Sequence, residues 1–251
     1  MATWITHLMV ADSVLQKLPW LDRRGFCVGN IAPDCNIENE DWTAFTPSRE
    51  VTHWMSGAKK DGGDAEMFLE EYVLKRIDMI VSNEEFSFLL GYYSHLVADA
   101  EYQRMTRDPE RVSQVWKRID GDSEISARAQ CMERTWDSVK IIVPKRERFR
   151  EIYSIEGEYL RRNPRSGYFT EIMALKEFPD YIDYLPHGAI VRKIPKMTVS
   201  EELLRPIDKY ISITKDEVET FRVAVVDHVT ERIKEIREKY ASTFADTCHP
   251  V

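Results

Sequence analysis

The sequence of 251 residues has few cysteines and no long apolar run, and these absences exclude several classes of protein. The four cysteines, Cys27, Cys35, Cys131 and Cys248, form no CxxC pair. Their sparse, irregular placement predicts reduced thiols rather than a disulfide framework. No apolar stretch approaches the ~20 residues that a bilayer span requires, and the N-terminus lacks the basic and apolar regions of a secretory signal. The sequence therefore predicts a soluble, cytoplasmic protein without a transmembrane segment.

An excess of positive charge and the common nucleotide-binding motifs are missing as well. The chain has 35 Lys and Arg residues against 43 Asp and Glu residues, which gives a net charge of −8. This sign disfavours non-specific binding to nucleic acid, and we interpret the basic stretch 145–150 as a solvated, charge-paired helix face. The sequence contains no P-loop, no dinucleotide-binding glycine fingerprint and no serine-nucleophile motif.

Helical periodicity dominates what is present, and no alternating strand pattern of useful length occurs. Capping boxes at 82–85, 198–201 and 214–217 each predict a helix start. A short element is expected at 26–31 and a polar loop at 36–52. The longer helices are expected at 4–18, 64–80, from 83 onward, 109–120, 123–143 and 217–240. The predicted class is all-α.

Length and composition bound the domain organisation. Hydrophobic residues make up 43% of the chain, which is enough for one sizeable core. The composition becomes more charged after Pro144. We therefore expect a single all-α domain over 1–251, with a metal-binding core at 1–143 and a helical extension at 144–251 that forms a subdomain.

The most informative stretch surrounds His95 and Asp99. Phe86 to Ala100 carries apolar residues on nearly every side, so a helix here is expected to be buried almost all round. The four-residue spacing places the imidazole and the carboxylate on one face. A buried carboxylate without a partner is costly. A bound divalent metal would satisfy both side chains, since imidazole and carboxylate are standard zinc ligands.

Three further polar residues sit among apolar neighbours in the first hundred residues: His7, Asp34 and His53. Taken alone, each histidine is better read as a hydrogen-bonded core residue and Asp34 as a turn or cap residue. A metal-free core in which the five residues bond one another is a further alternative. Because they fall on separate elements that can converge on one core, they are also candidate metal ligands.

Four phrases of the sequence occur in an order that resembles the zinc-dependent phospholipase C family, particularly its cytoplasmic bacterial members. They are Trp4-Ile-Thr-His7, Gly29-Asn-Ile-Ala-Pro-Asp34, Thr52-His53-Trp54 and Gly91-Tyr-Tyr-Ser-His95-Leu-Val-Ala-Asp99. The resemblance covers roughly residues 1–105. It implies a single multi-helix domain of the phospholipase C and zinc nuclease type, followed here by a C-terminal helical extension.

The resemblance also implies a set of ligands. Asp34, His53, His95 and Asp99 match the ligands of one zinc ion, and His7 matches a ligand of a second ion, with Asp99 bridging both. Asp34 is the candidate catalytic residue, which would orient or deprotonate the attacking water in addition to or instead of binding metal. We expect one zinc ion with provision for a second, and a site of this composition also accepts manganese, iron or nickel.

The sequence departs from the secreted enzymes of that family in two respects. Their N-terminal tryptophan binds metal through its free amine, whereas Trp4 here is preceded by three residues. A further zinc in those enzymes uses later histidines and a His-x-x-x-Glu pair, but the next histidine after Asp99 is His187, with Val191 four residues on. These departures predict a site that holds fewer metal ions than the site of the secreted enzymes.

Two hypotheses from different classes follow. The first is a zinc-dependent phosphoesterase, a phospholipase C-like hydrolase in which a metal-activated water attacks phosphorus in a small phosphate-ester substrate. The alternative is a non-catalytic protein whose metal site is structural and which acts as a binding or interaction module. An open coordination position would favour the enzyme, and closed four-ligand coordination would favour the module.

Overall fold

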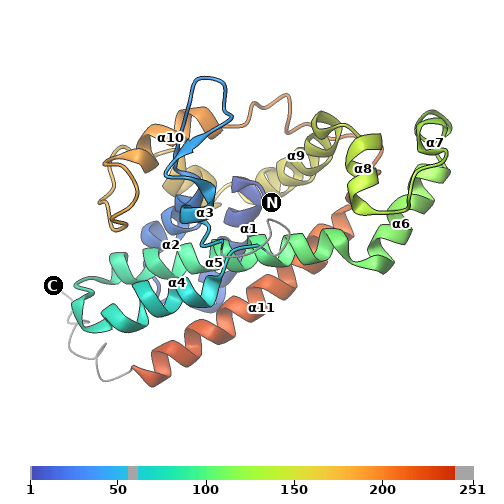
Figure 1. Cartoon of the computed structure of the whole chain (residues 1–251). Coiled ribbons are helices and arrows are strands. Elements are labelled where there is room, and N and C mark those ends of the chain that lie inside the picture. The colour runs from blue at the N-terminus through green and yellow to red at the C-terminus, as the bar shows by residue number, and fades with distance from the viewer. Residues whose placement is uncertain (1, 56–61, 241–251) are drawn as a thin grey trace. The chain divides into compact units, whose positions relative to one another are not determined.

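The computed structural model describes residues 2–55 and 62–240 (Figure 1). Almost all of its regular structure is helical, and the prediction of an all-α fold is confirmed. The chain forms two compact units: unit 1 comprises 1–100, 165–198 and 224–251, and unit 2 comprises 101–164 and 199–223. Both units are discontinuous in sequence. The organisation as one domain with a core at 1–143 and an extension at 144–251 stays a prediction, and Cys248 lies outside the described residues.

Unit 1 holds all the predicted site residues. Its elements are α1 (Trp4–Lys17), α2 (Arg23–Gly29), η1 (Ala32–Asp34), β1 (Ile37–Glu38), β2 (Phe45–Thr46), α3 (Arg49–Thr52), α4 (Ala65–Tyr72), η2 (Leu74–Met79), most of α5 (Asn83–Arg107), η3 (Tyr168–Ile172), α10 (Ala189–Met197) and the later part of α11 (Lys215–Lys239). In Figure 1 the blue N-terminal helices gather beside the green α5.

Several helix boundaries in unit 1 follow from capping side chains. The Thr3 hydroxyl accepts from the amide of Thr6 at 3.4 Å, and α1 begins at Trp4. The Asp64 carboxylate accepts from the amide of Met67 at 2.9 Å, which confirms the predicted helix start there. The predicted single helix over 64–80 is wrong, because α4 ends at Tyr72 and a separate 3₁₀ segment, η2, follows.

The segment 36–52 is more ordered than the predicted loop. Strands β1 and β2 form a short antiparallel hairpin in which Ile37 pairs with Thr46 and Glu38 with Phe45. The four-residue helix α3 follows after Ser48. Strand pairs this short give no detectable alternation in sequence, which explains why neither element was expected.

The middle of α5 is buried on all sides, as its composition predicts. Phe88, Leu90, Tyr92, Tyr93 and Leu96 are completely buried. The Ser82 hydroxyl accepts from the amide of Glu85 at 3.1 Å, so the predicted cap at this helix start is present. The polar residues of α5 are therefore held at fixed depth within an apolar core.

Unit 2 contains the end of α5, α6 (Pro109–Asp120), α7 (Ser123–Ala129), α8 (Trp136–Ile142), α9 (Lys145–Arg162) and the start of α11. Its core includes Val115, Trp116, Ile119 and Val139. The predicted helix over 123–143 is wrong: the chain turns through Cys131, whose φ is +68°, and Thr135 caps the new helix α8.

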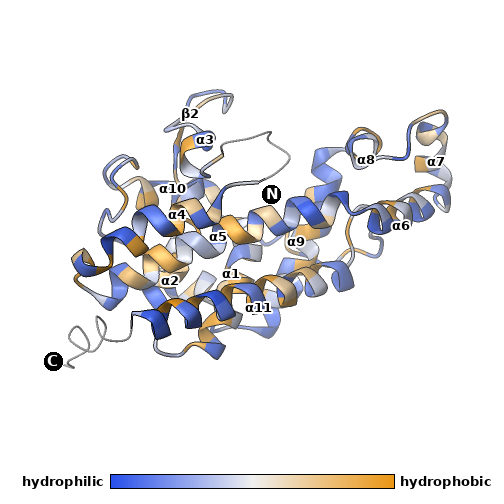
Figure 2. Cartoon of the chain, turned by 60° about the horizontal axis from the view of Figure 1, so that its bottom comes forward, coloured by the Kyte–Doolittle hydropathy of each residue, from blue (hydrophilic) through white to orange (hydrophobic). Residues whose placement is uncertain are grey.

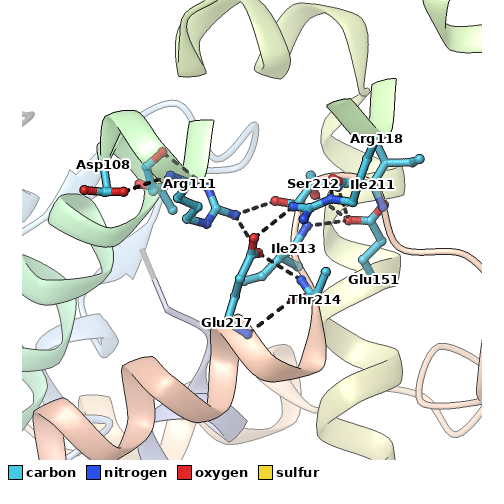
Figure 3. A network of polar contacts seen from close by, with 10 residues as sticks. Asp108, Arg111, Arg118, Glu151, Ile211, Ser212, Ile213, Thr214 and Glu217 are labelled. Atoms are coloured by element: carbon cyan, nitrogen blue, oxygen red, sulfur yellow. Dashed lines mark hydrogen bonds and ion pairs between the residues drawn. The ribbon is translucent and has the colours of Figure 1, made fainter. Parts of the chain in front are cut away.

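A polar network joins the helices of unit 2 to the segment 211–214 (Figure 3). The Glu151 carboxylate accepts from the amides of Ile211 and Ser212, each at 2.8 Å, and from that of Ile213 at 3.1 Å. Burial raises the pKa of Glu151, although these donors act in the opposite direction. The carboxylate thus fixes an irregular segment whose amides have no helical partners.

The start of α11 is a capping box, as predicted. The Thr214 hydroxyl accepts from the amide of Glu217 at 3.3 Å, and the Glu217 carboxylate accepts from the amide of Thr214 at 3.0 Å. Arg118 also donates to Glu217, at 2.9 Å (Figure 3). The capping box expected at 198–201 is wrong, because no helix begins there and the Thr198 hydroxyl instead donates to the carbonyl of Ile194 at the end of α10.

Figure 2 shows hydrophilic and hydrophobic residues alternating along α11, the pattern of an amphipathic helix. Across the described ranges, none of the helices has the length and apolar character needed to cross a membrane.

Candidate metal centre

The five residues predicted as ligands come together in unit 1. His7 lies on α1, Asp34 ends η1, His53 directly follows α3, and His95 and Asp99 lie one turn apart on α5. Two groups have ligand atoms within 4.8 Å of one another: His7, His95 and Asp99 form one group, and Asp34, His53 and His95 form the other. Elements up to 92 residues apart in sequence therefore converge on one cluster.

The cluster is buried on one side and accessible on the other. The side chains of His7, His53 and Asp99 are 0%, 3% and 6% exposed, and His95 is completely buried. The Asp34 side chain is 15% exposed. Solvent therefore reaches the cluster from the side of Asp34, and the two stacked imidazoles of His7 and His95 form its interior.

His95 has one ring nitrogen engaged and one unengaged. Its Nδ1 lies 2.8 Å from the carbonyl oxygen of Asn30, which can only accept, so Nδ1 carries the proton. The Nε2 atom then has a lone pair, and it is buried without a hydrogen-bond partner among the described residues. A backbone carbonyl on the second nitrogen is the arrangement that orients metal-bound histidines.

The position of His95 relative to Asn30 depends on backbone packing of α2 against α5. A Cβ on Gly29 would lie 2.1 Å from the carbonyl oxygen of Phe88, and one on Gly91 would lie 2.3 Å from that of Phe26. No side chain fits at either position, so two glycines allow the helices to approach until Asn30 reaches His95. This role of the two glycines was not predicted from the sequence.

His53 is oriented by its neighbour in sequence. Its Nδ1 lies 2.9 Å from the Thr52 hydroxyl, and its Nε2 lies 2.7 Å from Nη2 of Arg49. A guanidinium group only donates, so Nε2 is the acceptor and Nδ1 carries the proton. The Nε2 lone pair of His53 is therefore engaged by Arg49 at the edge of the cluster, where Nε2 lies 3.3 Å from Oδ1 of Asp34.

The backbone around His53 is held from both sides. The Tyr92 hydroxyl donates to the carbonyl of Thr52 at 2.5 Å and accepts from Tyr184 at 2.9 Å, and Tyr184 in turn accepts from the Trp54 indole at 3.1 Å. Trp54 has a φ of +52°, an unfavourable conformation for a bulky residue that the surrounding contacts must impose. Gly63 packs so closely that a Cβ there would lie 1.8 Å from the carbonyl oxygen of His53.

Asp99 belongs to the first group and also approaches His53 of the second. Its Oδ1 is 3.5 Å from Nε2 of His7 and accepts from the amide of Ala2 at 3.1 Å. Its Oδ2 is 3.7 Å from Nε2 of His53. One oxygen thus faces each histidine, which is the geometry that a bridging carboxylate needs.

His7 is the least supported of the three histidines. Its ring stacks on that of His95, with centroids 3.7 Å apart and planes 9° apart. In the described part of the chain, neither of its ring nitrogens has a hydrogen-bond partner. A buried imidazole without hydrogen bonds is costly, and nothing in the described residues orients it as Asn30 orients His95.

The electrostatics of the cluster keep the histidine neutral and the carboxylates ionised. Burial, reinforced by the neighbouring His7, lowers the pKa of His95 to about 3. Burial by itself raises the pKa of both Asp34 and Asp99, but contacts with His53 and His7 respectively, together with nearby positive charge, hold both well below their ordinary value. Neutral imidazole and ionised carboxylate are the forms that bind metal.

The donor set fits a divalent cation. Two carboxylates lie beside imidazoles whose buried nitrogens have no hydrogen-bond partner among the described residues: Nε2 of His95 and both ring nitrogens of His7. Mixed imidazole and carboxylate ligands suit zinc and other first-row metals. Both groups contain His95, but His95 offers a single lone pair and can bind only one ion. The ligand set is therefore more complete for one ion than for two.

Arg49 is a residue of the cluster that sequence reasoning missed. Besides its contact with His53, its Nη2 lies 3.7 Å from Oδ1 of Asp34 and 3.8 Å from Oδ2 of Asp99. The residue stands in a polar segment that predicts a loop, and an arginine there usually points into solvent. No local signal distinguishes it.

Other candidates lie outside the cluster. His187 is almost fully exposed and pairs with Asp180. In the basic stretch 145–150, Arg150 donates to the carbonyls of Leu203 and Arg205 at 2.6 and 2.9 Å, so this cation holds a neighbouring segment of unit 2.

Comparison with known families agrees with the resemblance in the sequence. Residues 6–101 match the family described as zinc dependent phospholipase C, and this span contains all five residues of the cluster. No curated protein and no solved structure matches the chain.

Proposed function

We propose that the protein is a metal-dependent hydrolase of phosphoester bonds and that zinc is the ion it uses. The observation that carries this proposal is the buried cluster of three imidazoles and two carboxylates, in which His95 presents an unengaged, oriented Nε2. The family match over residues 6–101 supports the same chemistry.

Asp34, His53, His95 and Asp99 are proposed to hold the first ion, and His7 together with Asp99 a second. A bound divalent ion lowers the pKa of a bound water and offsets negative charge on the phosphoryl oxygens. Asn30 and Thr52 act through His95 and His53: the Asn30 carbonyl fixes the proton of His95 on Nδ1, and the Thr52 hydroxyl holds the His53 ring in place.

Asp34 is the proposed residue that orients the attacking water. It is the more exposed of the two carboxylates, at 15% against 6% for Asp99. Asp34 therefore has the geometry to accept a hydrogen bond from water on the accessible side, while Asp99 is enclosed between histidines. This partial exposure also favours an open site over the closed coordination of a structural metal.

The experiment combines zinc analysis with hydrolysis of a chromogenic phosphodiester, bis(p-nitrophenyl) phosphate. The wild-type protein should bind zinc and release p-nitrophenolate, and chelation should abolish both. Asp99→Asn should lose zinc and activity. Asp12→Asn is a matched control, because Asp12 is an equally buried carboxylate that instead pairs with Arg23 and the amide of Gly167.

Three results would contradict the proposal. A wild-type protein that takes up no zinc from a zinc-replete buffer would exclude the metal site. Stoichiometric zinc without hydrolysis of any phosphomonoester or phosphodiester offered would favour the structural metal site. Equal zinc content and activity in Asp99→Asn and Asp12→Asn would show that the cluster is not the centre responsible.

A further inference from the structure

We infer that the Arg49 guanidinium competes with metal for the ligand atoms of the cluster and binds the phosphoryl oxygens of the substrate once metal is bound. This inference rests on the proposed function and adds the residue that recognises the phosphate. It begins from the three contacts of Nη2: 2.7 Å to His53, 3.7 Å to Asp34 and 3.8 Å to Asp99.

The first step is competition for the same atoms. The Nε2 atom of His53 has one lone pair, and in this structure a guanidinium N–H uses it. The carboxylates of Asp34 and Asp99 face the same nitrogen of Arg49. A metal ion held by His53, Asp34 and Asp99 needs these same acceptor atoms, so Arg49 must release His53 when metal enters.

The second step is where the guanidinium can go. The Arg49 side chain is 28% exposed, which is more than Asp34 at 15% and far more than Asp99 at 6%. It therefore extends over the accessible side of the cluster. Arg49 is also the first residue of α3, a helix of only four residues, and its long side chain can withdraw toward solvent without moving the backbone.

The third step is charge. Asp34 and Asp99 contribute −2, a divalent ion contributes +2, and Arg49 contributes +1, so the loaded site has a net charge of about +1. A phosphodiester carries one negative charge and presents two terminal oxygens. The planar fork of a guanidinium matches two such oxygens with two parallel hydrogen bonds, which a lysine cannot reproduce.

The test on the unmodified sequence uses an arginine-specific dicarbonyl, phenylglyoxal, with the modified sites read by mass spectrometry. Arg49 should react slowly in the metal-free protein, faster after zinc is bound, and slowly again when inorganic phosphate is added to protein freed of excess zinc. Arg76 is the internal control, because it is 39% exposed in the same unit and packs over the Tyr72 ring. Its reactivity should not change.

The second measurement uses Arg49→Gln and Arg49→Lys. Arg49→Gln should bind zinc more tightly than wild type, since its competitor is gone, and the zinc-loaded variant should bind inorganic phosphate about 10- to 100-fold more weakly. Arg49→Lys should fall between, because it retains charge but not the fork.

The inference is overturned if zinc leaves Arg49 reactivity unchanged, or if phosphate fails to protect Arg49 in the zinc-loaded protein. Unchanged phosphate affinity in a folded Arg49→Gln protein would also overturn it. Because zinc binding, phosphate binding and labelling are measured without turnover, these results are independent of whether the wild-type protein hydrolyses a phosphodiester.

Discussion

Gly91→Ala should destabilise the protein, although alanine is the better helix former. A Cβ at this position would lie 2.3 Å from the carbonyl oxygen of Phe26 and 3.1 Å from the Cα of Gly29. Ordinary contact begins near 3.4 Å, so α2 must retreat from α5 by about 1 Å. The obstacle is backbone, which cannot rotate out of the way as a flexible side chain can.

The sizes of three free-energy terms decide whether Gly91→Ala stabilises or destabilises the protein. Alanine in a helix interior is favoured over glycine by about 1 kcal/mol. Overpacking a tight core costs about 1–3 kcal/mol. The same retreat would stretch the 2.8 Å bond from His95 to the carbonyl of Asn30 and leave buried polar groups unpaired, at a cost of about 1–3 kcal/mol. The net expectation is a loss of about 1–5 kcal/mol in the free energy of unfolding.

The assay is urea unfolding of the metal-free protein, with zinc affinity measured by competition against a chelating dye. Gly121→Ala is the matched control, since its Cβ would meet nothing closer than 3.5 Å and its φ of −76° suits alanine. That variant should be unchanged or more stable by up to about 1 kcal/mol. Gly91→Ala should also bind zinc about 10- to 100-fold more weakly, because His95 loses the carbonyl that orients it.

A Gly91→Ala protein with wild-type stability and zinc affinity would refute the reasoning. It would show that α2 and α5 have more freedom than the glycine contact indicates. It would also show that the contact with Asn30 does not set the orientation of His95. Loss of stability with unchanged zinc affinity would separate the two claims and leave only the packing argument standing.

Three further outcomes are expected. Thr52→Val, which removes the hydroxyl at Nδ1 of His53 and preserves side-chain shape, should weaken zinc binding about 10- to 100-fold with little change in stability; equal affinity would contradict the orienting role. The metal-free protein should lose stability as pH falls from about 6.5 toward 3, because the unfolded chain protonates His95 in that range while the folded chain does not; a urea midpoint constant over this range would contradict it. Glu151→Gln should destabilise unit 2 by about 1–3 kcal/mol and speed tryptic cleavage after Lys209, since an amide cannot accept from all the donors that face it; unchanged cleavage would mean that the carboxylate does not hold this segment.

The parts of the fold that could be predicted are those with a local chemical cause. The run around His95 is apolar on every side, and the structure buries it completely. The caps at Asp64 and Thr214 are side chains bonding to nearby amides, so their effect is encoded within a few residues. The all-α class follows from many such signals that agree.

The predictions that were wrong concern segments where the residue pattern does not determine the local structure. The helix expected over 123–143 ends at Ala129, and Cys131 then takes a φ of +68° although no glycine or proline marks the turn in the sequence. The capping pattern at 198–201 has the right residues, but the Thr198 hydroxyl bonds backward to Ile194 instead. In the second case one local hydrogen bond replaces another that the same residues could form, and in the first no residue type marks the left-handed position, so neither outcome can be read from the sequence pattern.

In the candidate site, too, some residues could be predicted from the sequence and others could not. His95 and Asp99 can be identified because a buried imidazole and carboxylate are expensive, so their presence in an apolar helix calls for an explanation. Arg49 carries no such mark: an arginine in a polar segment costs nothing, and its importance arises only when α3 places it against carboxylates from η1 and α5. A residue that recognises substrate must stay accessible, and for that reason it resembles ordinary surface in the sequence. The metal ligands of such a site are therefore easier to predict than the group that binds the phosphate beside them.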